Sequence, residues 1–230
     1  MQAQLSCIFN HAVKFYDLKG SPVIKAGPLG KGTAEEMLFW TKEEYLKFTD
    51  IVKDKVQSYY AFQILYWGGL RVGELLALTY EDFDFEKQII RINKSYQRLK
   101  GKDVITDPKT AKSKRTITMP DFLSNEMQIY CSKLYGLTNK DRIFCITKSF
   151  LHHEMQRGAT KSGVKKIRIH DLRHSHVSLL INMGFTAVAI GNRVGHESID
   201  ITYRYAHMFP TEQTQMATML NNEFIKEARE

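Results

Sequence analysis

The chain has 230 residues, of which 43% are hydrophobic, and a formal net charge of +8. This composition suits a globular protein with a sizeable core and excludes disorder over most of the chain. No apolar run is long enough to cross a membrane, and the first residues lack the pattern of a secretion signal, so we expect a cytoplasmic protein without a membrane partner. The excess of basic residues is compatible with a polyanionic partner, although many basic proteins have none.

The first part of the chain has the pattern of an appendage to a larger domain. A short helical segment is expected over residues 5–16, and the stretch 20–32, rich in glycine, proline and lysine, indicates a linker. We therefore divide the chain into an appendage, residues 1–36, and a main domain, residues 37–230.

Helical patterns follow through most of the main domain. Thr41 and Glu44 have the spacing of a capping box, which predicts that a helix begins in the segment TKEEYLKFTDIVKD. The glycines at 68 and 69 interrupt the apolar pattern and force a turn just before Arg71. The other helical segments that we expect are 55–66, 72–78, 121–135, 149–157, 171–183, 186–194, 199–207 and 211–226.

The hydrophobic period changes from 3.6 to 2 in the middle of the chain. Residues 88–92 (QIIRI) and 115–119 (RTITM) alternate in β-branched side chains, which predicts two strands. Residues 93–100 are expected to pair between these strands. The sequence therefore predicts a mainly α fold with a small antiparallel β-sheet, that is, an α+β domain.

The densest group of chemically active side chains lies in the motif HDLRHSH, which contains His170, Arg173, His174 and His176. Residues three and four apart share a helix face, so His170 can act beside either Arg173 or His174. An arginine beside a titratable histidine suits a phosphate, because the guanidinium binds two oxygens while the imidazole exchanges a proton. Two other interpretations stay open: a solvated basic helix start, and a zinc site on His170 and His174.

Two further motifs carry cations. In GLRVGE, Arg71 lies near a helix N-terminus, where backbone amides favour an anion, and Glu74 can hold its guanidinium. In DPKT, Lys109 precedes the strand that begins with Arg115. The basic segment 98–115 can follow a phosphate backbone or can be a solvated loop.

The motif GHESIDITYRYAH supplies His196 and, nine residues later, Tyr205. Tyr203 and Tyr205 are two positions apart, about 200° around a helix, so only one of them can face a given pocket. By spacing alone, a buried aromatic residue at such a position is by default part of the core.

In order and in spacing, these motifs resemble the tyrosine recombinase (phage integrase) family over nearly all of residues 37–210. The six positions that match the family's active site are Arg71, Lys109, His170, Arg173, His196 and Tyr205. The resemblance implies that the two arginines bind the scissile phosphate, that His196 supports it, and that Tyr205 is the nucleophile. It also implies that Lys109 and His170 handle protons, and Glu74 resembles the acidic residue that supports the first arginine.

The sequence departs from the family pattern in small ways. Val194 stands where the family commonly has leucine before the Gly-His pair, and GSPV replaces the usual Asn-Pro near the linker. Family members normally carry an N-terminal core-binding domain, and we expect residues 1–36 to be a remnant of its last helix with the linker. Residues 37–230 are then the catalytic domain with a C-terminal tail helix.

The implied chemistry needs no cofactor. A phosphodiester attacked by a phenolate develops negative charge on its non-bridging oxygens, which fixed cations stabilise. The energy of the broken bond is conserved in a covalent 3′-phosphotyrosine, which a 5′-hydroxyl later attacks. The sequence has no paired acidic cluster for Mg²⁺ and no P-loop, so we expect neither metal nor ATP.

We therefore predict a site-specific DNA integrase that acts in the integration and excision of a mobile element or prophage. The expected partners are duplex attachment sites, other copies of the chain in a homotetramer joined through the C-terminal tail, and an accessory directionality factor. The cations expected to contact DNA are Lys112, Lys114, Arg115, Lys165, Lys166 and Arg168. Two alternatives remain: a type IB topoisomerase, which relaxes supercoils without strand exchange, and a non-catalytic DNA-binding regulator, which would show losses among the six positions.

Overall fold

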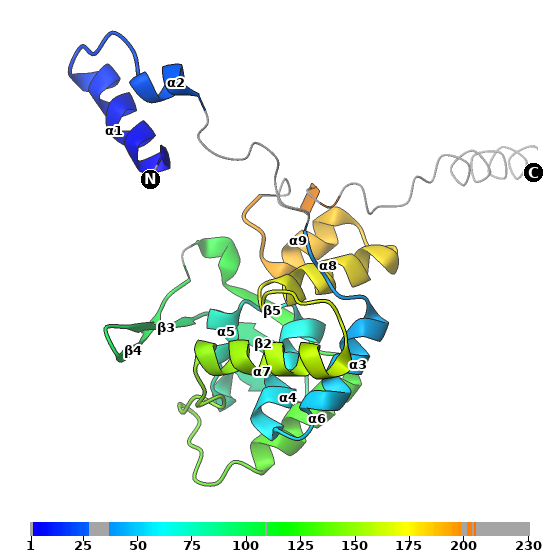
Figure 1. The fold of residues 1–230 in the computed structure, drawn as a ribbon. Coiled ribbons are helices and arrows are strands. Elements are labelled where there is room, and N and C mark those ends of the chain that lie inside the picture. The colour runs from blue at the N-terminus through cyan, green and yellow to red at the C-terminus, as the bar shows by residue number, and fades with distance from the viewer. Residues whose placement is uncertain (1, 28–36, 109, 199–201, 204, 206–230) are drawn as a thin grey trace, which may run out of the picture. The chain divides into compact units, whose positions relative to one another are not determined.

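The computed structural model describes residues 2–27, 37–108, 110–198, 202–203 and 205. The chain divides into two compact units, Met1–Met37 and Leu38–Glu230. The first unit contains α1 (Gln2–Phe15) and α2 (Pro22–Ala26) (Figure 1). The short helix α2 lies inside the stretch predicted as a linker, so that prediction was wrong for these residues. Pro22 occupies the first turn of α2, where its fixed φ angle favours a helix.

Helices dominate the second unit, which confirms the predicted fold class. They are α3 (Lys42–Val52), α4 (Val56–Gly68), α5 (Val72–Ala77), α6 (Asp121–Ser132), α7 (Lys148–Ser162), α8 (Asp171–Asn182) and α9 (Ala187–Val194). The predicted capping box is present, because the hydroxyl of Thr41 accepts from the Glu44 amide at 3.3 Å and the Glu44 carboxylate accepts from the Thr41 amide at 2.8 Å. In the described part of the chain, no helix is long and apolar enough to span a membrane.

The predicted helix boundaries hold to within a few residues at most ends. The helix α6 stops three residues before the expected end, and α7 continues five residues beyond it. Of the helix predicted over 199–207, the structure describes Thr202, Tyr203 and Tyr205, with the first two in helical conformation. The helix predicted over 211–226 lies outside the described residues.

The two predicted strands pair in an antiparallel sheet. Strand β2 (Ile89–Ile92) lies between β1 (Phe83–Asp84) and β5 (Arg115–Thr118), with Ile90 opposite Ile117. A short helical turn, η1 (Tyr80–Asp82), precedes β1, and another, η2 (Ala111–Ser113), precedes β5.

The segment 93–100 does not pair between β2 and β5, so that prediction was wrong. It contains β3 (Ser95–Leu99), which forms a separate hairpin with β4 (Lys102–Thr106). The reason is the two-residue turn between these strands: Lys100 and Gly101 both have positive φ angles, 49° and 79°. Two successive residues with positive φ match the twist of a tight hairpin.

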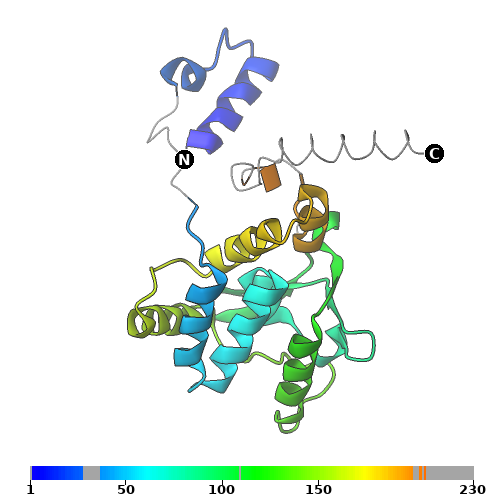
Figure 2. The same ribbon diagram turned by 90° about the vertical axis from the view of Figure 1, so that its right-hand side faces the viewer.

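The core of the second unit is rich in aromatic residues and packs α3 against both α4 and α7. Tyr45 of α3 stacks on Tyr66 of α4 with ring centroids 3.6 Å apart. Gly158 of α7 lies against the ring of Phe48, where a β-carbon would clash, so the two helices approach closely. Figure 2 shows α3 and α4 side by side, with α8 crossing above them.

The junction between α4 and α5 positions the first motif arginine. Gly69 follows α4 with a φ of 67°, and a β-carbon at this position would lie 2.5 Å from the ring of His176. Only glycine satisfies both conditions, since other residues disfavour positive φ and carry the clashing atom. The chain therefore turns tightly at Gly69, and Arg71 becomes the N-cap residue of α5.

Candidate active site

The carboxyl end of α9 holds three arginine side chains through three successive backbone carbonyls, those of residues 193–195. Arg115 donates to the first carbonyl at 2.9 Å, Arg173 to the second, and Arg71 to the third at 3.2 Å. The last carbonyls of a helix lack partners within the helix and carry partial negative charge. One helix end therefore fixes three cations that come from three different parts of the sequence.

Gly195 allows α9 to end in this way. Its φ angle is 69°, and a β-carbon would lie 3.0 Å from Cδ of Arg115. The left-handed conformation ends the helix and directs its last carbonyls toward the arginines. The Gly-His motif is thus a structural requirement of the cation cluster.

Glu74 joins two of the three arginines. Its carboxylate accepts from Nη1 of Arg71 at 2.8 Å and from Nη1 and Nη2 of Arg115 at 3.0 and 2.9 Å. The Glu74 side chain is 5% exposed and that of Arg115 is 6% exposed. Burial opposes ionisation of Glu74, but the hydrogen bonds and charges of Arg115 and Arg71 keep its pKa below the ordinary value. The predicted contact between Glu74 and Arg71 is present, and Arg115 is a second partner that the sequence did not reveal.

Glu74→Gln should destabilise the fold strongly, because it leaves two guanidiniums facing a neutral amide. Removing one partner of a buried ion pair costs about 3–5 kcal/mol. The folded state lowers the pKa of Glu74, so its ionised carboxylate contributes fully to the free energy of unfolding at pH values above the ordinary carboxyl pKa of about 4.3. This contribution is lost as the pH falls through the lowered pKa. The variant should therefore lose less stability than the parent on acidification from neutral pH.

Urea unfolding at neutral and acidic pH measures both effects. Glu86→Gln, which changes an exposed carboxylate, is the control and should unfold like the parent protein. A Glu74→Gln variant with parental stability at neutral pH would show that the ion pair contributes little to the fold.

Arg173 is the deepest of the three arginines. Its Nη1 donates to the carbonyl of Gly69 at 2.9 Å, so the turn after α4 and the end of α9 hold it from two sides. Burial, followed by the charges of Arg71 and Arg115, lowers the pKa of Arg173 to about 9. The guanidinium therefore stays positive at neutral pH, although part of its hydration is lost.

Two of the predicted histidines stand at the ends of helices near these arginines. His170 is the N-cap residue of α8 and is exposed, and desolvation of its ring, followed by the charge of Arg173, lowers its pKa. His196 follows α9, and its Nδ1 lies 2.8 Å from the hydroxyl of Thr202. Burial, followed by the charges of Arg173 and Arg71, lowers the pKa of His196 to about 3. Neutral His196 can donate a hydrogen bond to an anion without carrying a charge of its own.

The structure distinguishes the two tyrosines of the last motif. Tyr205 is 2% exposed and Tyr203 is 55% exposed. The hydroxyl of Tyr205 contacts Nδ1 of His174, and Tyr205 is close enough to Arg173 to influence its pKa. His174 is absent from the predicted site. Its only signal in the sequence is its position four residues after His170 in the histidine motif.

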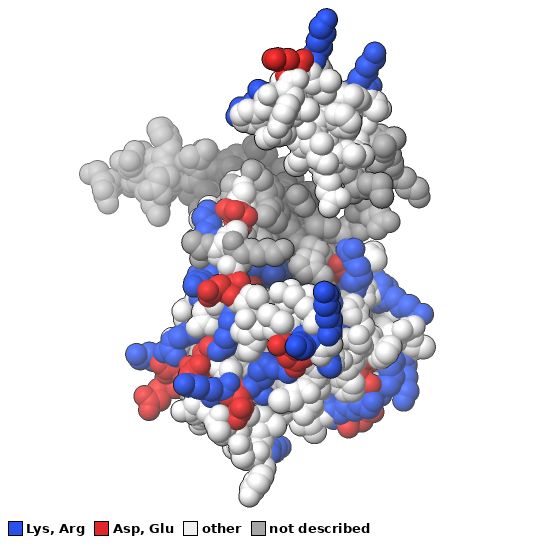
Figure 3. Space-filling view, turned by 90° about the vertical axis from the view of Figure 1, so that its left-hand side faces the viewer, with Lys and Arg blue, Asp and Glu red and all other residues white. Residues whose placement is uncertain are grey.

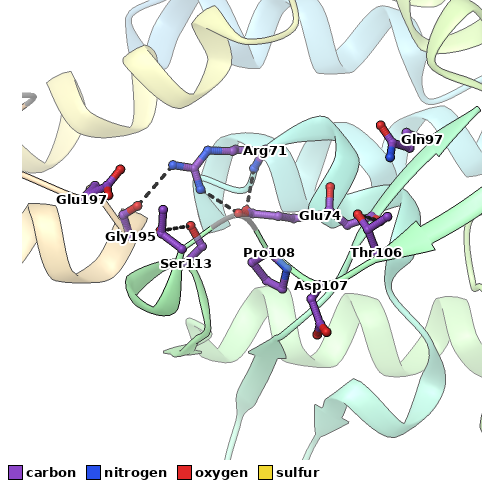
Figure 4. A pocket seen from close by; sticks show the side chains of 11 residues that line it. Arg71, Glu74, Gln97, Thr106, Asp107, Pro108, Ser113, Gly195 and Glu197 are labelled. Carbon is purple, nitrogen blue, oxygen red and sulfur yellow. Dashed lines mark hydrogen bonds and ion pairs between the residues drawn. The ribbon is translucent and has the colours of Figure 1, made fainter. Parts of the chain in front are cut away.

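A cavity of about 440 Å³ opens beside Arg71 (Figure 4). Its walls come from α5, from the β3–β4 hairpin and from the segment after α9, and they include Pro108 and Thr110. Gly73 of α5 keeps the hairpin close, because a β-carbon there would lie 2.6 Å from the hydroxyl of Ser95. Lys109 itself lies outside the described residues.

The cations predicted to contact DNA divide into one buried side chain and a set of exposed ones. Arg115 is buried and paired with Glu74, so it belongs to the interior of the site. The exposed ones are Lys112, Lys114, Lys165, Lys166 and Arg168. Several have local partners: Nζ of Lys114, for example, lies 3.2 Å from Asp107. Figure 3 shows Lys and Arg side chains interspersed with Asp and Glu on one face.

The comparisons with known proteins agree with the motifs. The chain is 32% identical over 241 residues to the ICEBs1 integrase of Bacillus subtilis (strain 168), an alignment that covers 96% of this chain and 64% of that protein. It is 28% identical to the integrase of Mycobacterium phage L5, over 78% of this chain and 49% of that protein. The chain thus spans about half to two thirds of the length of these relatives.

Solved structures show the same fold. A fragment of the Tn1549 transposon integrase, in complex with a circular intermediate DNA, superposes with a TM-score of 0.78 and 22% identity over 97% of this chain and 77% of that chain. The family model described as the phage integrase family matches residues 39–212, which include all six predicted active-site positions. The chain therefore belongs to the phage integrase family.

Proposed function

We propose that the chain is the catalytic domain of a site-specific DNA recombinase that breaks and rejoins duplex DNA through a 3′-phosphotyrosine at Tyr205. The observation that carries this proposal is the end of α9. It holds Arg71 and Arg173 through its carbonyls, and the chain that leaves it reaches the buried hydroxyl of Tyr205 only ten residues after Gly195. Phosphate-binding cations and a nucleophile are thereby tied to one structural element.

The proposed reaction uses these groups as follows. The guanidiniums of Arg71 and Arg173 bind the non-bridging oxygens of the scissile phosphate and stabilise the charge that develops on them. The oxygen of Tyr205 forms a bond to phosphorus while the bond to the 5′-oxygen breaks. The 5′-hydroxyl of another strand later reverses the exchange, so the energy of the phosphodiester is kept.

The other predicted residues take supporting roles in the proposal. Lys109 protonates the leaving 5′-oxygen, His170 assists proton transfer, and neutral His196 donates a hydrogen bond to the phosphate. Glu74 fixes the direction of the Arg71 guanidinium through the ion pair described above. Support for Lys109 comes from its neighbours Pro108 and Thr110, which line the cavity beside Arg71.

We extend the proposal to the integration and excision of a mobile element. Its support is the similarity to integrases named after ICEBs1, a mycobacterial phage and the Tn1549 transposon. The proposed partners are duplex attachment sites, other copies of this chain in a tetramer joined through the C-terminal tail, and a directionality factor. In the same proposal, residues 1–36 are the end of a core-binding domain and residues 37–230 are the catalytic domain.

The test is covalent trapping with nicked duplexes that tile the DNA flanking the gene for this chain. A nick just 3′ to the scissile phosphate releases a short 5′-hydroxyl fragment and prevents religation. We expect a protein–DNA adduct whose DNA is attached to Tyr205, as mapped by peptide mass spectrometry, and we expect the same yield with and without EDTA. Attachment to another residue would contradict the assigned nucleophile, and loss of the adduct in EDTA would contradict the metal-free reaction.

A further inference from the structure

The hydroxyl of Tyr205 has a basic group at hydrogen-bonding distance, the Nδ1 atom of His174. The ring of His174 is 17% exposed and lies in the second turn of α8, on the same face as His170. The ring centroids of His174 and Tyr205 are 5.7 Å apart. The contact therefore joins the proposed nucleophile to a side chain that has no role in the reaction outlined above.

The charge nearest to the ring of His174 favours a proton on Nε2. Its Nε2 atom lies 3.8 Å from Oδ1 of Asp171, whose side chain is fully buried. A proton on Nε2 faces this carboxylate, which leaves the lone pair of Nδ1 directed at the hydroxyl of Tyr205. Arg168 donates to both oxygens of Asp171 and fixes the carboxylate in place. The order of groups is then carboxylate, imidazole and phenol.

We propose that His174 is a catalytic general base that removes the phenolic proton of Tyr205, with the nearby carboxylate of Asp171 stabilising the imidazolium that forms. This inference rests on the proposed function, since it assigns a role within the same cleavage step. In that step the proton of the Tyr205 hydroxyl moves to Nδ1 of His174 as the bond from oxygen to phosphorus forms. The bond from phosphorus to the 5′-oxygen breaks, and a separate acid protonates the leaving oxygen.

The charges around His174 keep its imidazole neutral and make it a weak base in the free protein. Desolvation of the ring, followed by the charge of His170, lowers the pKa of His174 to about 4, and Arg168 and Arg173 act in the same direction while Asp171 opposes them. The imidazole is therefore neutral at physiological pH and can accept a proton. A bound phosphodiester brings a negative charge close to these cations, which raises the pKa of a nearby imidazole. Binding of DNA thus strengthens the base at the moment when it is needed.

The decisive test uses His174→Asn, first with the ordinary Tyr205 and then with a more acidic phenol at position 205. Asparagine can place an amide near the position of Nδ1 but cannot take up a proton, so general-base catalysis is lost while a polar contact to Tyr205 remains possible. We expect single-turnover adduct formation on the trapped duplex to slow by about 10²–10⁴-fold. His153→Asn, at an exposed position on α7, is the matched control and should cleave like the parent.

Replacement of Tyr205 by a trifluorotyrosine then separates a base from a structural contact. The fluorinated phenol is more acidic and ionises without help, so the deficit of His174→Asn should shrink by at least about tenfold relative to the deficit measured with ordinary tyrosine. Such rescue requires a folded active site, and a misfolded variant cannot produce it. A 5′-bridging sulfur in the substrate, which removes the need for an acid, should not rescue His174→Asn.

The outcomes distinguish this inference from the function on which it rests. Parental rates for His174→Asn, or an equal deficit with both phenols, would overturn the general-base role while the adduct at Tyr205 still supports the recombinase. The absence of any adduct with the unmodified chain would overturn both.

Discussion

Tyr205→Phe should abolish the covalent adduct on nicked duplexes and leave the affinity for DNA nearly unchanged. The substitution removes one hydroxyl, whose oxygen is the atom that bonds to phosphorus in the proposed reaction, while the proposed contacts of the other residues with DNA remain. Its cost in stability should be small, because the ring of Tyr205 still fills the same buried position. Denaturing gels measure the adduct, and a filter-binding titration on the same duplex measures the affinity.

Tyr203→Phe is the matched control. The two tyrosines are separated by one residue, but Tyr203 is 55% exposed, whereas the hydroxyl of Tyr205 contacts His174. Tyr203→Phe should therefore form the adduct at the parental rate. If Tyr203→Phe blocks the adduct and Tyr205→Phe does not, the nucleophile has been assigned to the wrong side chain.

Arg173→Ala should slow cleavage by about 10²–10³-fold, which is the loss typical of one preorganised donor to developing charge. A substrate with a 5′-bridging sulfur should not restore the rate of this variant.

Lys109→Ala should behave differently. A sulfur leaving group needs no protonation, so this variant should be slow on ordinary DNA and much closer to the parent on the sulfur substrate.

The comparison uses single-turnover rates for both variants on both substrates. Arg173→Lys serves as a further control, because it keeps the charge but lacks the planar fork that reaches the two carbonyls. An equal deficit of Lys109→Ala on the two substrates would remove Lys109 from the role of acid and make it a binding residue. Rescue of Arg173→Ala by sulfur would show that this arginine acts on the leaving group.

The sequence predicted the local features of the fold well. Thr41 and Glu44 form the expected capping box, and the expected strands β2 and β5 pair antiparallel. These features depend on residues close together in sequence or on a simple alternation of side chains. The hairpin of β3 and β4 was missed because Lys100 is an unusual residue at a positive φ angle, so the turn has no strong signal.

The site was predictable only as a set of motifs. Each motif identified its own candidate residues, but the hydrogen bonds and ion pairs that bring these residues together join positions far apart in the sequence. Glu74 and Arg115 are 41 residues apart, and Arg71 and Gly195 are 124 apart. A basic residue in the basic segment 98–115 is expected on the surface, and nothing local to Arg115 shows that a buried carboxylate lies opposite it. The contact of His174 with Tyr205 is of the same kind, because the two residues are 31 positions apart.

The cation cluster at the end of α9 also sets a limit on the stability of the free protein. In the part of the chain that the structure describes, Glu74 is the one carboxylate within ion-pair distance of Arg71, Arg115 or Arg173. Three positive charges therefore share one negative charge, and burial, followed by the charges of Arg71 and Arg115, lowers the pKa of Arg173. A bound phosphodiester would supply further negative charge beside these arginines, so DNA binding should raise the free energy of unfolding. Neutralising Arg115 should nevertheless destabilise the fold, because it removes the buried partner of Glu74, so this one ion pair is what allows three cations to gather at the helix end.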